Sequence, residues 1–330
     1  MPIPRWPWTG CTSTGTRSGK RPTDLLHGIR TGPSHTHGND RRQRKISTVD
    51  EFGWCWWFRG ARRPKEDKLD ERVLAGGNEN RVVQVGDTVR RPVHPWTPAV
   101  HALLRRLESS GFPESPRVLG FDGQGREILT MIPGTVGNHP VRPEMTSDRS
   151  LVACARMLRR YHAAAAIQPG WAELPWRYRD PDPSTWEVIC HGDVATYNIV
   201  YDGELPVGMI DFDVAGPGPR MWDIAYAAFR LVPLASDESC RGFGFATLPD
   251  RPARLRLFLG AYGLDDATGL LETAVRRVEI LRDDILARAT AGDPSVATQL
   301  AEDHVGSYTS DLAWIHANQE TLASDGQRDP

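Results

Sequence analysis

The sequence predicts an α+β fold in which a small, β-rich part precedes a larger, mainly helical part. Two observations carry this prediction. Residues 81–132 contain two strand–turn–strand patterns on either side of one helical pattern, and the chain after residue 150 repeats apolar side chains at helical spacing. With 330 residues, 39% of them hydrophobic, the chain is long enough to bury a sizeable core.

The small part contains two predicted hairpins joined by a helix. Arg81–Arg91 has two β-branched runs around a Gly-Asp turn, which is a hairpin signal. Arg117–Phe121 and Glu127–Ile132 flank a second Gly-containing turn and predict another hairpin. Pro95–Ser109, between the two hairpins, has the spacing of an amphipathic helix. The apolar face of this helix is predicted to consist of Val100, Leu103, Leu104 and Leu107.

The larger part is predicted from two long helical patterns, Ser150–Ala165 and Ala274–Ala287, whose apolar stripes are typical of core helices. Pro133 and Gly134 mark its junction with the small part. No apolar run reaches 18 residues, so we expect no membrane-spanning helix and no membrane partner. The predicted segments are a leader at residues 1–70, the small part at 71–132, the larger part at 133–320 and a tail at 321–330.

The leader differs in composition from the rest of the chain. It holds 14 basic and 7 acidic residues, whereas residues 71–330 hold 26 basic residues, all arginine, and 35 acidic ones. Its abundance of Gly, Pro, Ser and Thr predicts a mostly disordered segment, and a nucleic-acid or membrane patch at Arg41–Lys45 is the less favoured interpretation. We expect no nucleic-acid partner. The five scattered cysteines, without a CxxC pair, favour a cytoplasmic protein.

Polar residues accompany three short apolar strands between residues 187 and 213. His191 and Asp193 follow the strand Val188–Cys190, Asn198 begins a second strand and Asp211 lies near the end of a third. We expect Asp193, Asn198 and Asp211 to point into one place. Two carboxylates and an amide suit Mg²⁺, and Asp193 could also act as a general base toward a hydroxyl. Such residues also close turns, but this spacing within one hairpin favours a functional site.

This pattern resembles that of the aminoglycoside phosphotransferase family, a branch of the protein-kinase-like fold. The resemblance covers roughly Leu74 to Ala317 and is strongest at His191–Asn198, Asp211–Asp213 and Trp222–Ala225. It implies a two-lobed protein-kinase-like fold, with a small β-rich N-lobe and a larger helical C-lobe. It also implies an enzyme that uses Mg²⁺ and transfers the γ-phosphate of ATP or GTP to a hydroxyl of a small molecule.

The resemblance further implies a role for each residue of the pattern. Asp193 would be the catalytic aspartate that orients the acceptor hydroxyl, and Asn198 and Asp211 would be the magnesium ligands. His191 would brace the loop by packing and hydrogen bonding. Asp223 would be a buried aspartate that holds the loop in shape.

Binding of the nucleotide phosphates requires a cation, and kinase-like enzymes use a lysine on the third strand. This chain has no lysine after its leader, so we expect Arg91 in that role, or Arg90 if the strand register slips by one. Met131 and Ile132 are expected to contact the adenine. The helix of the small part offers no glutamate to pair with the cation, and His101 on that helix is expected to face solvent.

Two function classes remain from the sequence. The first is an O-phosphotransferase acting on a small alcohol, and the alternative is a pseudokinase-like nucleotide-binding protein with little turnover. The acidic excess after residue 70 suggests a cationic, aminoglycoside-like acceptor, unless the late acidic residues are solvated helix faces paired with arginines. Those acidic residues are Asp265, Asp266, Glu272, Glu279, Asp283, Asp284, Glu302 and Asp303, and the arginines are Arg276, Arg277, Arg282 and Arg288.

Overall fold

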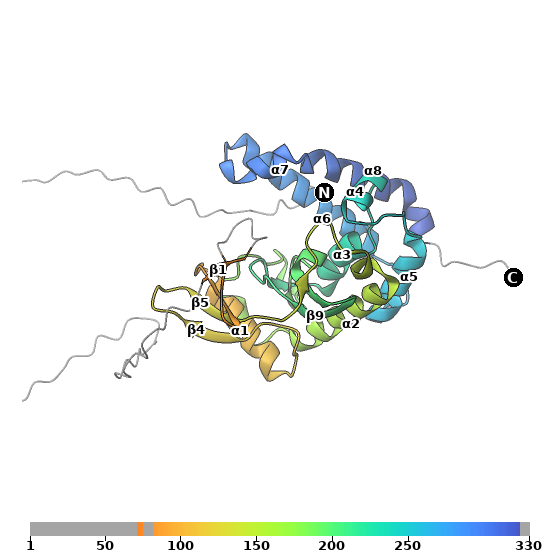
Figure 1. Cartoon of the computed structure of the whole chain (residues 1–330). Coiled ribbons are helices and arrows are strands. Elements are labelled where there is room, and N and C mark those ends of the chain that lie inside the picture. The colour runs from red at the N-terminus through yellow and green to blue at the C-terminus, as the bar shows by residue number, and fades with distance from the viewer. Residues whose placement is uncertain (1–70, 75–81, 324–330) are drawn as a thin grey trace, which may run out of the picture. The chain divides into compact units, whose positions relative to one another are not determined.

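The computed structural model describes residues 71–74 and 82–323, so the predicted leader lies outside the described residues. An antiparallel sheet of five strands, in the order β1-β2-β3-β5-β4, lies together with helix α1 (Figure 1). Both predicted hairpins are present in it, β2–β3 and β4–β5. The strands are β1 (Arg72–Val73), β2 (Val83–Val85), β3 (Thr88–Arg91), β4 (Val118–Phe121) and β5 (Glu127–Thr130).

The pairing of β3 with β5 decides which side chains share a face of this sheet. Arg91 lies opposite Glu127, and Val89 lies opposite Leu129. Because side chains alternate along a strand, these four residues lie on one face and Arg90 lies on the other. The strand register therefore separates the two arginines that the sequence left as alternatives.

Helix α1 (Thr97–Ser109) begins after Trp96, with a proline in its first turn, where the missing N–H breaks no helical hydrogen bond. The predicted apolar face of α1 is buried. His101 is also buried, with 3% of its surface exposed, so the expectation that it faces solvent is wrong. The physical reason is its contact with Glu127 of β5.

The strands in the central part of the chain form two smaller sheets. One contains β6 (Thr135–Val136), β8 (Ile199–Asp202) and β9 (Leu205–Met209), and the other pairs β7 (Val188–Cys190) with β10 (Gly216–Gly218). A backbone hydrogen bond of 2.9 Å, from the N–H of Met209 to the carbonyl of Glu114, joins β9 to the segment between α1 and β4.

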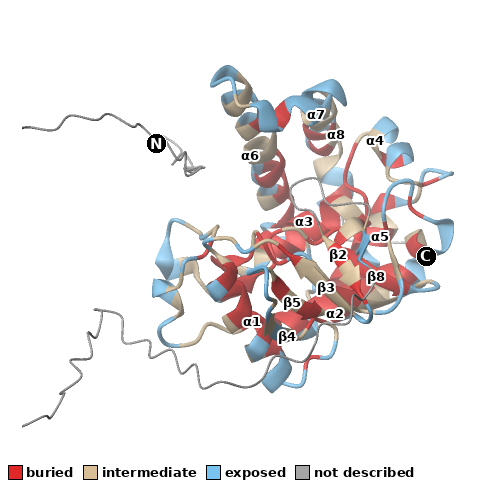
Figure 2. Cartoon of the chain, turned by 60° about the vertical axis from the view of Figure 1, so that its left-hand side comes forward, coloured by how far each residue is buried: buried red, intermediate tan, exposed pale blue. Residues whose placement is uncertain are grey.

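The remainder is helical, as the sequence predicts. Helix α3 is largely buried and helices α2 and α5 each have one buried face, while the end of α6 and much of α7 are exposed (Figure 2). No helix in residues 71–74 and 82–323 combines the length and apolar character needed to cross a membrane. The helices are α2 (Asp148–Ala164), α3 (Arg220–Leu231), α4 (Asp237–Gly242), α5 (Arg251–Tyr262), α6 (Leu270–Thr290), α7 (Ala297–Ala301) and α8 (His304–Ala323).

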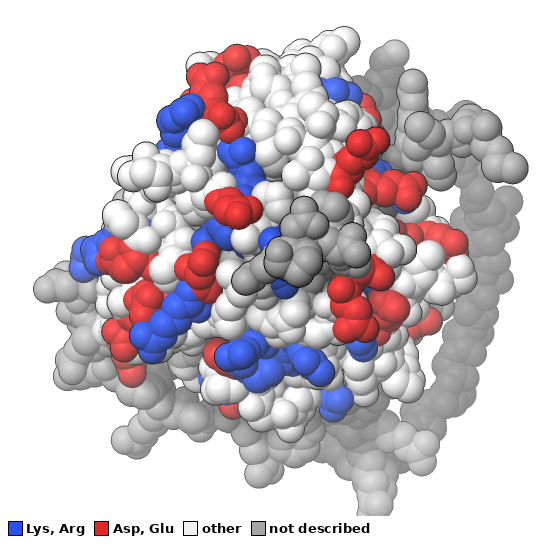
Figure 3. Space-filling model, turned by 90° about the vertical axis from the view of Figure 1, so that its right-hand side faces the viewer, with Lys and Arg blue, Asp and Glu red and all other residues white. Residues whose placement is uncertain are grey.

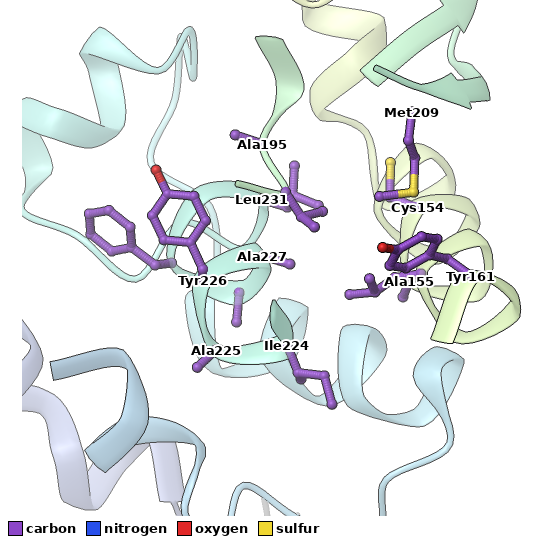
Figure 4. Packing of buried hydrophobic residues seen from close by; sticks show 14 of the residues in the cluster. Cys154, Ala155, Tyr161, Ala195, Met209, Ile224, Ala225, Tyr226, Ala227 and Leu231 are labelled. Atoms are coloured by element: carbon purple, nitrogen blue, oxygen red, sulfur yellow. The ribbon is translucent and has the colours of Figure 1, made fainter. Parts of the chain in front are cut away.

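The main core forms where α2 and α3 meet the β8–β9 hairpin. Cys154 and Tyr161 of α2, Leu231 of α3 and Met209 of β9 are all buried there (Figure 4). Burying a side chain of this size stabilises the fold by roughly 1.5–3 kcal/mol. The buried Tyr161 hydroxyl donates a hydrogen bond to the carbonyl of Ile189, 2.9 Å away. The core thus reaches the strand that leads into the predicted catalytic loop.

Candidate active site

The loop between β7 and β8 fixes both carboxylate oxygens of Asp193. The Asn198 side-chain amide donates to the Asp193 carbonyl and to Asp193 Oδ2, both at 2.9 Å. The Tyr197 hydroxyl donates to Asp193 Oδ1 at 2.8 Å. A short 3₁₀ turn, Thr196–Asn198, brings these partners back to Asp193 before β8 begins. The structure therefore unites the predicted catalytic aspartate with one of the predicted magnesium ligands.

His191 lies behind this loop and is fully buried. Its Nε2 donates to the Ile210 carbonyl at 3.0 Å, which leaves Nδ1 to accept from the Asp193 backbone N–H at 3.3 Å. The next residue, Gly192, has φ +83°, and a Cβ there would lie 2.6 Å from the Val214 carbonyl oxygen. Only glycine fits this turn without displacing the backbone. His191 is thus a bracing residue in this geometry and does not face the reaction side of Asp193.

Asp223 of α3 holds the same loop through hydrogen bonds to its backbone. Its carboxylate accepts from the backbone N–H groups of His191 and Gly192, at 2.6 and 2.8 Å, and from His162 Nε2 at 3.1 Å. Burial alone would raise the pKa of Asp223, but these hydrogen bonds and the nearby histidines lower it below its ordinary value. The position expected for Asp223, behind the site, agrees with this geometry.

We expect Asp223→Asn to destabilise the protein by about 3 kcal/mol, because an amide cannot accept from all three donors. Since the folded pKa is lowered, the stabilisation from Asp223 is present above pH ~4 and is lost as the pH falls through the lower folded pKa. Urea unfolding at several pH values would measure both effects. Asp283→Asn, on the exposed side of α6, is the control; equal losses in the two variants would contradict the prediction.

Arg91 is a buried cation surrounded by carboxylates close to Asp211. It is 8% exposed and contacts Glu127 Oε1 at 2.8 Å, Asp213 Oδ1 and, at 3.7 Å, Asp211 Oδ1. Burial alone would lower the pKa of Arg91, but these three carboxylates raise it, so the guanidinium stays charged. Arg90 instead contacts Thr88 and lies 3.9 Å from Asp122, away from this cluster.

Glu127 is a site residue that the sequence analysis missed. It is 2% exposed, and its second oxygen, Oε2, lies 2.7 Å from Nε2 of the buried His101. The carboxylate partner that α1 lacks therefore comes from β5, the strand next to the cation, and His101 connects α1 to that pair. As expected, α1 supplies no glutamate to the strand cation, but that cation still has a carboxylate partner. The only signal in the sequence was an acidic residue at the start of the predicted strand Glu127–Ile132; its position opposite Arg91 follows from the strand register.

We expect Glu127→Gln to raise the KM for nucleotide about tenfold, because loss of the ion pair with Arg91 Nε removes one of the charges that hold the guanidinium in place. Steady-state kinetics at varied nucleotide concentration measure this change. Asp283→Asn is the control, because Asp283 also pairs with an arginine but has an exposed side chain on α6. An unchanged KM in Glu127→Gln would show that the pair does not position Arg91.

Asp211 and Asn198 have the chemistry of a Mg²⁺ site. Just over half of the Asp211 side chain (53%) is exposed, and its pKa is raised, first because the surrounding protein limits its hydration and then because Asp213 repels its charge. The nitrogen of the Asn198 amide is held by Asp193, which leaves its oxygen as the end suited to a cation. Within residues 71–74 and 82–323, no group of three or more His, Cys, Asp or Glu is arranged to hold a metal. Mg²⁺ usually takes one or two protein oxygens plus waters and phosphates, so this donor set fits it.

Met131 and Ile132 line a cavity of about 580 Å³ beside the segment that joins β5 to β6. Thr130 and Arg117 line the same cavity. Alternation along β5 places Thr130 on the face opposite to Arg91. The structure therefore brings the predicted adenine contacts to a cavity at this linker, but not into the cluster around Arg91.

Arg277 of α6 is a second residue that the sequence analysis missed. It is 7% exposed, donates to the Gly192 carbonyl, and lies over the rings of Trp222 and Tyr226, at 4.6 and 4.7 Å from their centroids. Its expected place on a solvated helix face is wrong, because α6 turns this position toward the catalytic loop. From the helical periodicity alone, Arg277 could be predicted only to lie next to the apolar face of its helix.

Other arginines of α6 do pair with the late acidic residues. Arg282 contacts Asp283 at 2.8 Å and Arg288 contacts Asp284 at 3.3 Å. On the face shown in Figure 3, acidic and basic side chains lie next to one another in several places. These pairs weaken the sequence-based argument for a cationic acceptor.

Comparison with known proteins identifies the family of this chain. The model of the phosphotransferase enzyme family matches residues 70–188 and 171–258. The chain is 35% identical over 209 residues to the trifolitoxin immunity protein of Rhizobium leguminosarum bv. trifolii, across 59% of this chain and 75% of that protein.

Two solved structures resemble it in fold. An ethanolamine kinase of Plasmodium vivax superposes with a TM-score of 0.53 at 14% identity, covering 76% of this chain and 82% of the kinase. A complex of an aminoglycoside phosphotransferase with GDP and kanamycin superposes with a TM-score of 0.50 at 14% identity, covering 76% and 93%.

The family match defines a phosphotransferase, and the fold is that of kinase-like enzymes. The chain belongs to the phosphotransferase enzyme family. The predicted resemblance to the aminoglycoside phosphotransferase family and the predicted two-lobed, protein-kinase-like α+β fold are both confirmed.

Proposed function

We propose that this protein transfers the γ-phosphate of ATP or GTP to a hydroxyl of a small molecule, with Mg²⁺ as the metal. The observation that carries the proposal is the cluster of Asp193, Asn198, Asp211 and Arg91. Phosphoryl transfer requires positioning and charge neutralisation more than covalent chemistry, and these residues supply both.

In this proposal, Asp193 orients the acceptor hydroxyl and takes its proton. Arg91 contacts the phosphates, and Glu127 keeps its guanidinium turned into the site. Asn198 and Asp211 would hold Mg²⁺, which neutralises phosphate charge when bound. Met131 and Ile132 would contact the base, supported by their position beside a cavity at the linker.

The competing proposal is a pseudokinase-like protein. It was supported by two absences in the sequence: no lysine follows the leader, and the helix of the small part has no glutamate to pair with the strand cation. Arg91 and Glu127 form that ion pair with a different cation and from a different element. We therefore favour turnover over simple nucleotide binding.

The test is nucleotide hydrolysis in the absence of an added alcohol, since kinases of this kind transfer slowly to water. Release of ADP or GDP is measured with ATP and with GTP, each with Mg²⁺ and with EDTA. We expect Mg²⁺-dependent release that Asp193→Asn abolishes. Release that persists with EDTA, or in that variant, would contradict the proposal.

A further inference from the structure

Arg230 of α3 is a cation near the proposed catalytic aspartate that forms no ion pair within the described part of the chain. Its guanidinium carbon lies 5.2 Å from the centroid of the Tyr197 ring and 4.3 Å from that of Phe243. Its Nη2 lies 3.2 Å from His139 Nε2. Among residues 71–74 and 82–323, Arg230 forms no ion pair with an Asp or Glu, and Asp193 acts on it only through its charge.

Burial alone would lower the pKa of Arg230, but the nearby tyrosines and then Asp193 raise it, so the guanidinium stays charged without forming an ion pair to a described carboxylate. Burial and the arginine itself lower the pKa of His139 to about 4, so this imidazole is neutral at pH 7. Asp311 of α8 is directed elsewhere, because its Oδ1 accepts from the Ser236 backbone N–H at 2.9 Å. Both oxygens of Asp193 are held by Tyr197 and Asn198. The remaining close groups are aromatic rings, among them Phe229 and Phe243.

Tyr197 marks where an acceptor alcohol would lie. Its hydroxyl donates to Asp193 Oδ1 at 2.8 Å, as the hydroxyl of a substrate would. An acceptor that replaces this hydrogen bond places its remaining atoms near the Tyr197 ring, and Arg230 lies over that ring. A cationic group there would be repelled, whereas an anionic group would receive up to two parallel hydrogen bonds from the guanidinium.

Resting on the proposed function, we propose that the acceptor is a small alcohol with an anionic group, a carboxylate or a phosphate, which Arg230 binds. In the reaction, the acceptor oxygen forms a bond to the γ-phosphorus, and the bond from that phosphorus to the nucleoside diphosphate breaks. The hydroxyl proton goes to the Asp193 carboxylate. Arg230 acts only on binding and orientation of the acceptor.

A matched set of alcohols tests this proposal. Glycerate, glycerol 3-phosphate, glycerol and 3-amino-1,2-propanediol share a hydroxyl-bearing chain and differ in charge. Nucleoside diphosphate release above the alcohol-free rate is measured for the wild type, Arg230→Gln and Arg230→Lys. Arg241→Gln, on the exposed face of α4, is the matched control.

We expect at least one of the two anionic alcohols to exceed glycerol and the amine about 10- to 100-fold in kcat/KM. Arg230→Gln should remove this preference through KM, Arg230→Lys should keep part of it, and Arg241→Gln should keep all of it. Preference for the amine or for glycerol would overturn the proposal, and so would an unchanged preference in Arg230→Gln.

If the enzyme turns over none of the four alcohols, a binding measurement tests whether Arg230 binds an anion. Thermal stability is measured with saturating Mg²⁺ and ADP, which occupy the nucleotide site, while glycerate or phosphate is titrated. Stabilisation that disappears in Arg230→Gln but not in Arg241→Gln supports the proposal, and any other pattern rejects it. Nucleotide hydrolysis without added alcohol is measured separately. A lack of hydrolysis would count against the proposed phosphotransferase activity, but not against the anion site at Arg230.

Discussion

Asp193→Asn is expected to lower kcat for phosphoryl transfer by about 10²–10⁴-fold, the usual contribution of a general base. The amide keeps the size of the side chain and can still accept from Tyr197 or Asn198, but it cannot take a proton. The KM for the nucleotide should change little, because no phosphate contact is assigned to Asp193. Thermal stability should remain close to that of the wild type, since the side chain is only half-buried.

Steady-state kinetics at saturating nucleotide measure the effect of Asp193→Asn. Asp265→Asn, in the exposed turn before α6, removes one carboxylate elsewhere and serves as the control. Turnover within threefold of the wild type in Asp193→Asn would remove this residue from the mechanism. A loss confined to KM would instead assign Asp193 to binding.

Arg91→Met is expected to lower kcat/KM for the nucleotide about 10²–10³-fold, as removal of one electrostatic group from a transition-state site does. It leaves Glu127, Asp213 and Asp211 facing one another without their cation, so stability should also fall by about 3–5 kcal/mol. The kinetics must therefore be measured well below the melting temperature of the variant.

Two further variants separate these effects. Arg91→Lys restores the charge and should recover most of the stability and part of kcat/KM. Arg90→Met removes the neighbouring arginine on the opposite face of β3 and should leave the nucleotide kinetics unchanged. If Arg90→Met and Arg91→Met lower kcat/KM equally, the assignment of Arg91 to the phosphates is wrong.

The parts of the site that the sequence could predict are those encoded locally. Asp193 and Asn198 are joined by one short loop, and glycine at position 192 allows the turn between β7 and that loop. Strand periodicity and a turn residue are visible in a single sequence, so both hairpins of the small sheet were predictable as well.

The parts that could not be predicted depend on which elements meet. Glu127 lies 36 positions after Arg91, and only the register of β3 against β5 places it opposite the cation. His101 and Arg277 each lie on a helix whose rotation is fixed by packing. The same register separates Arg91 from Arg90, which strand alternation alone leaves equivalent.

The measurement that tests the central claim most directly is detection of the phosphorylated product. The wild type and Asp193→Asn, matched for folded protein, are incubated with Mg²⁺, ATP or GTP and a mixed pool of small alcohols, and ³¹P NMR follows the γ-phosphate. We predict a new phosphate-monoester signal that grows as the γ-phosphate signal declines in the wild type and is missing in Asp193→Asn. Conversion to free phosphate alone, or a monoester formed equally by the variant, would contradict phosphoryl transfer to an alcohol at Asp193.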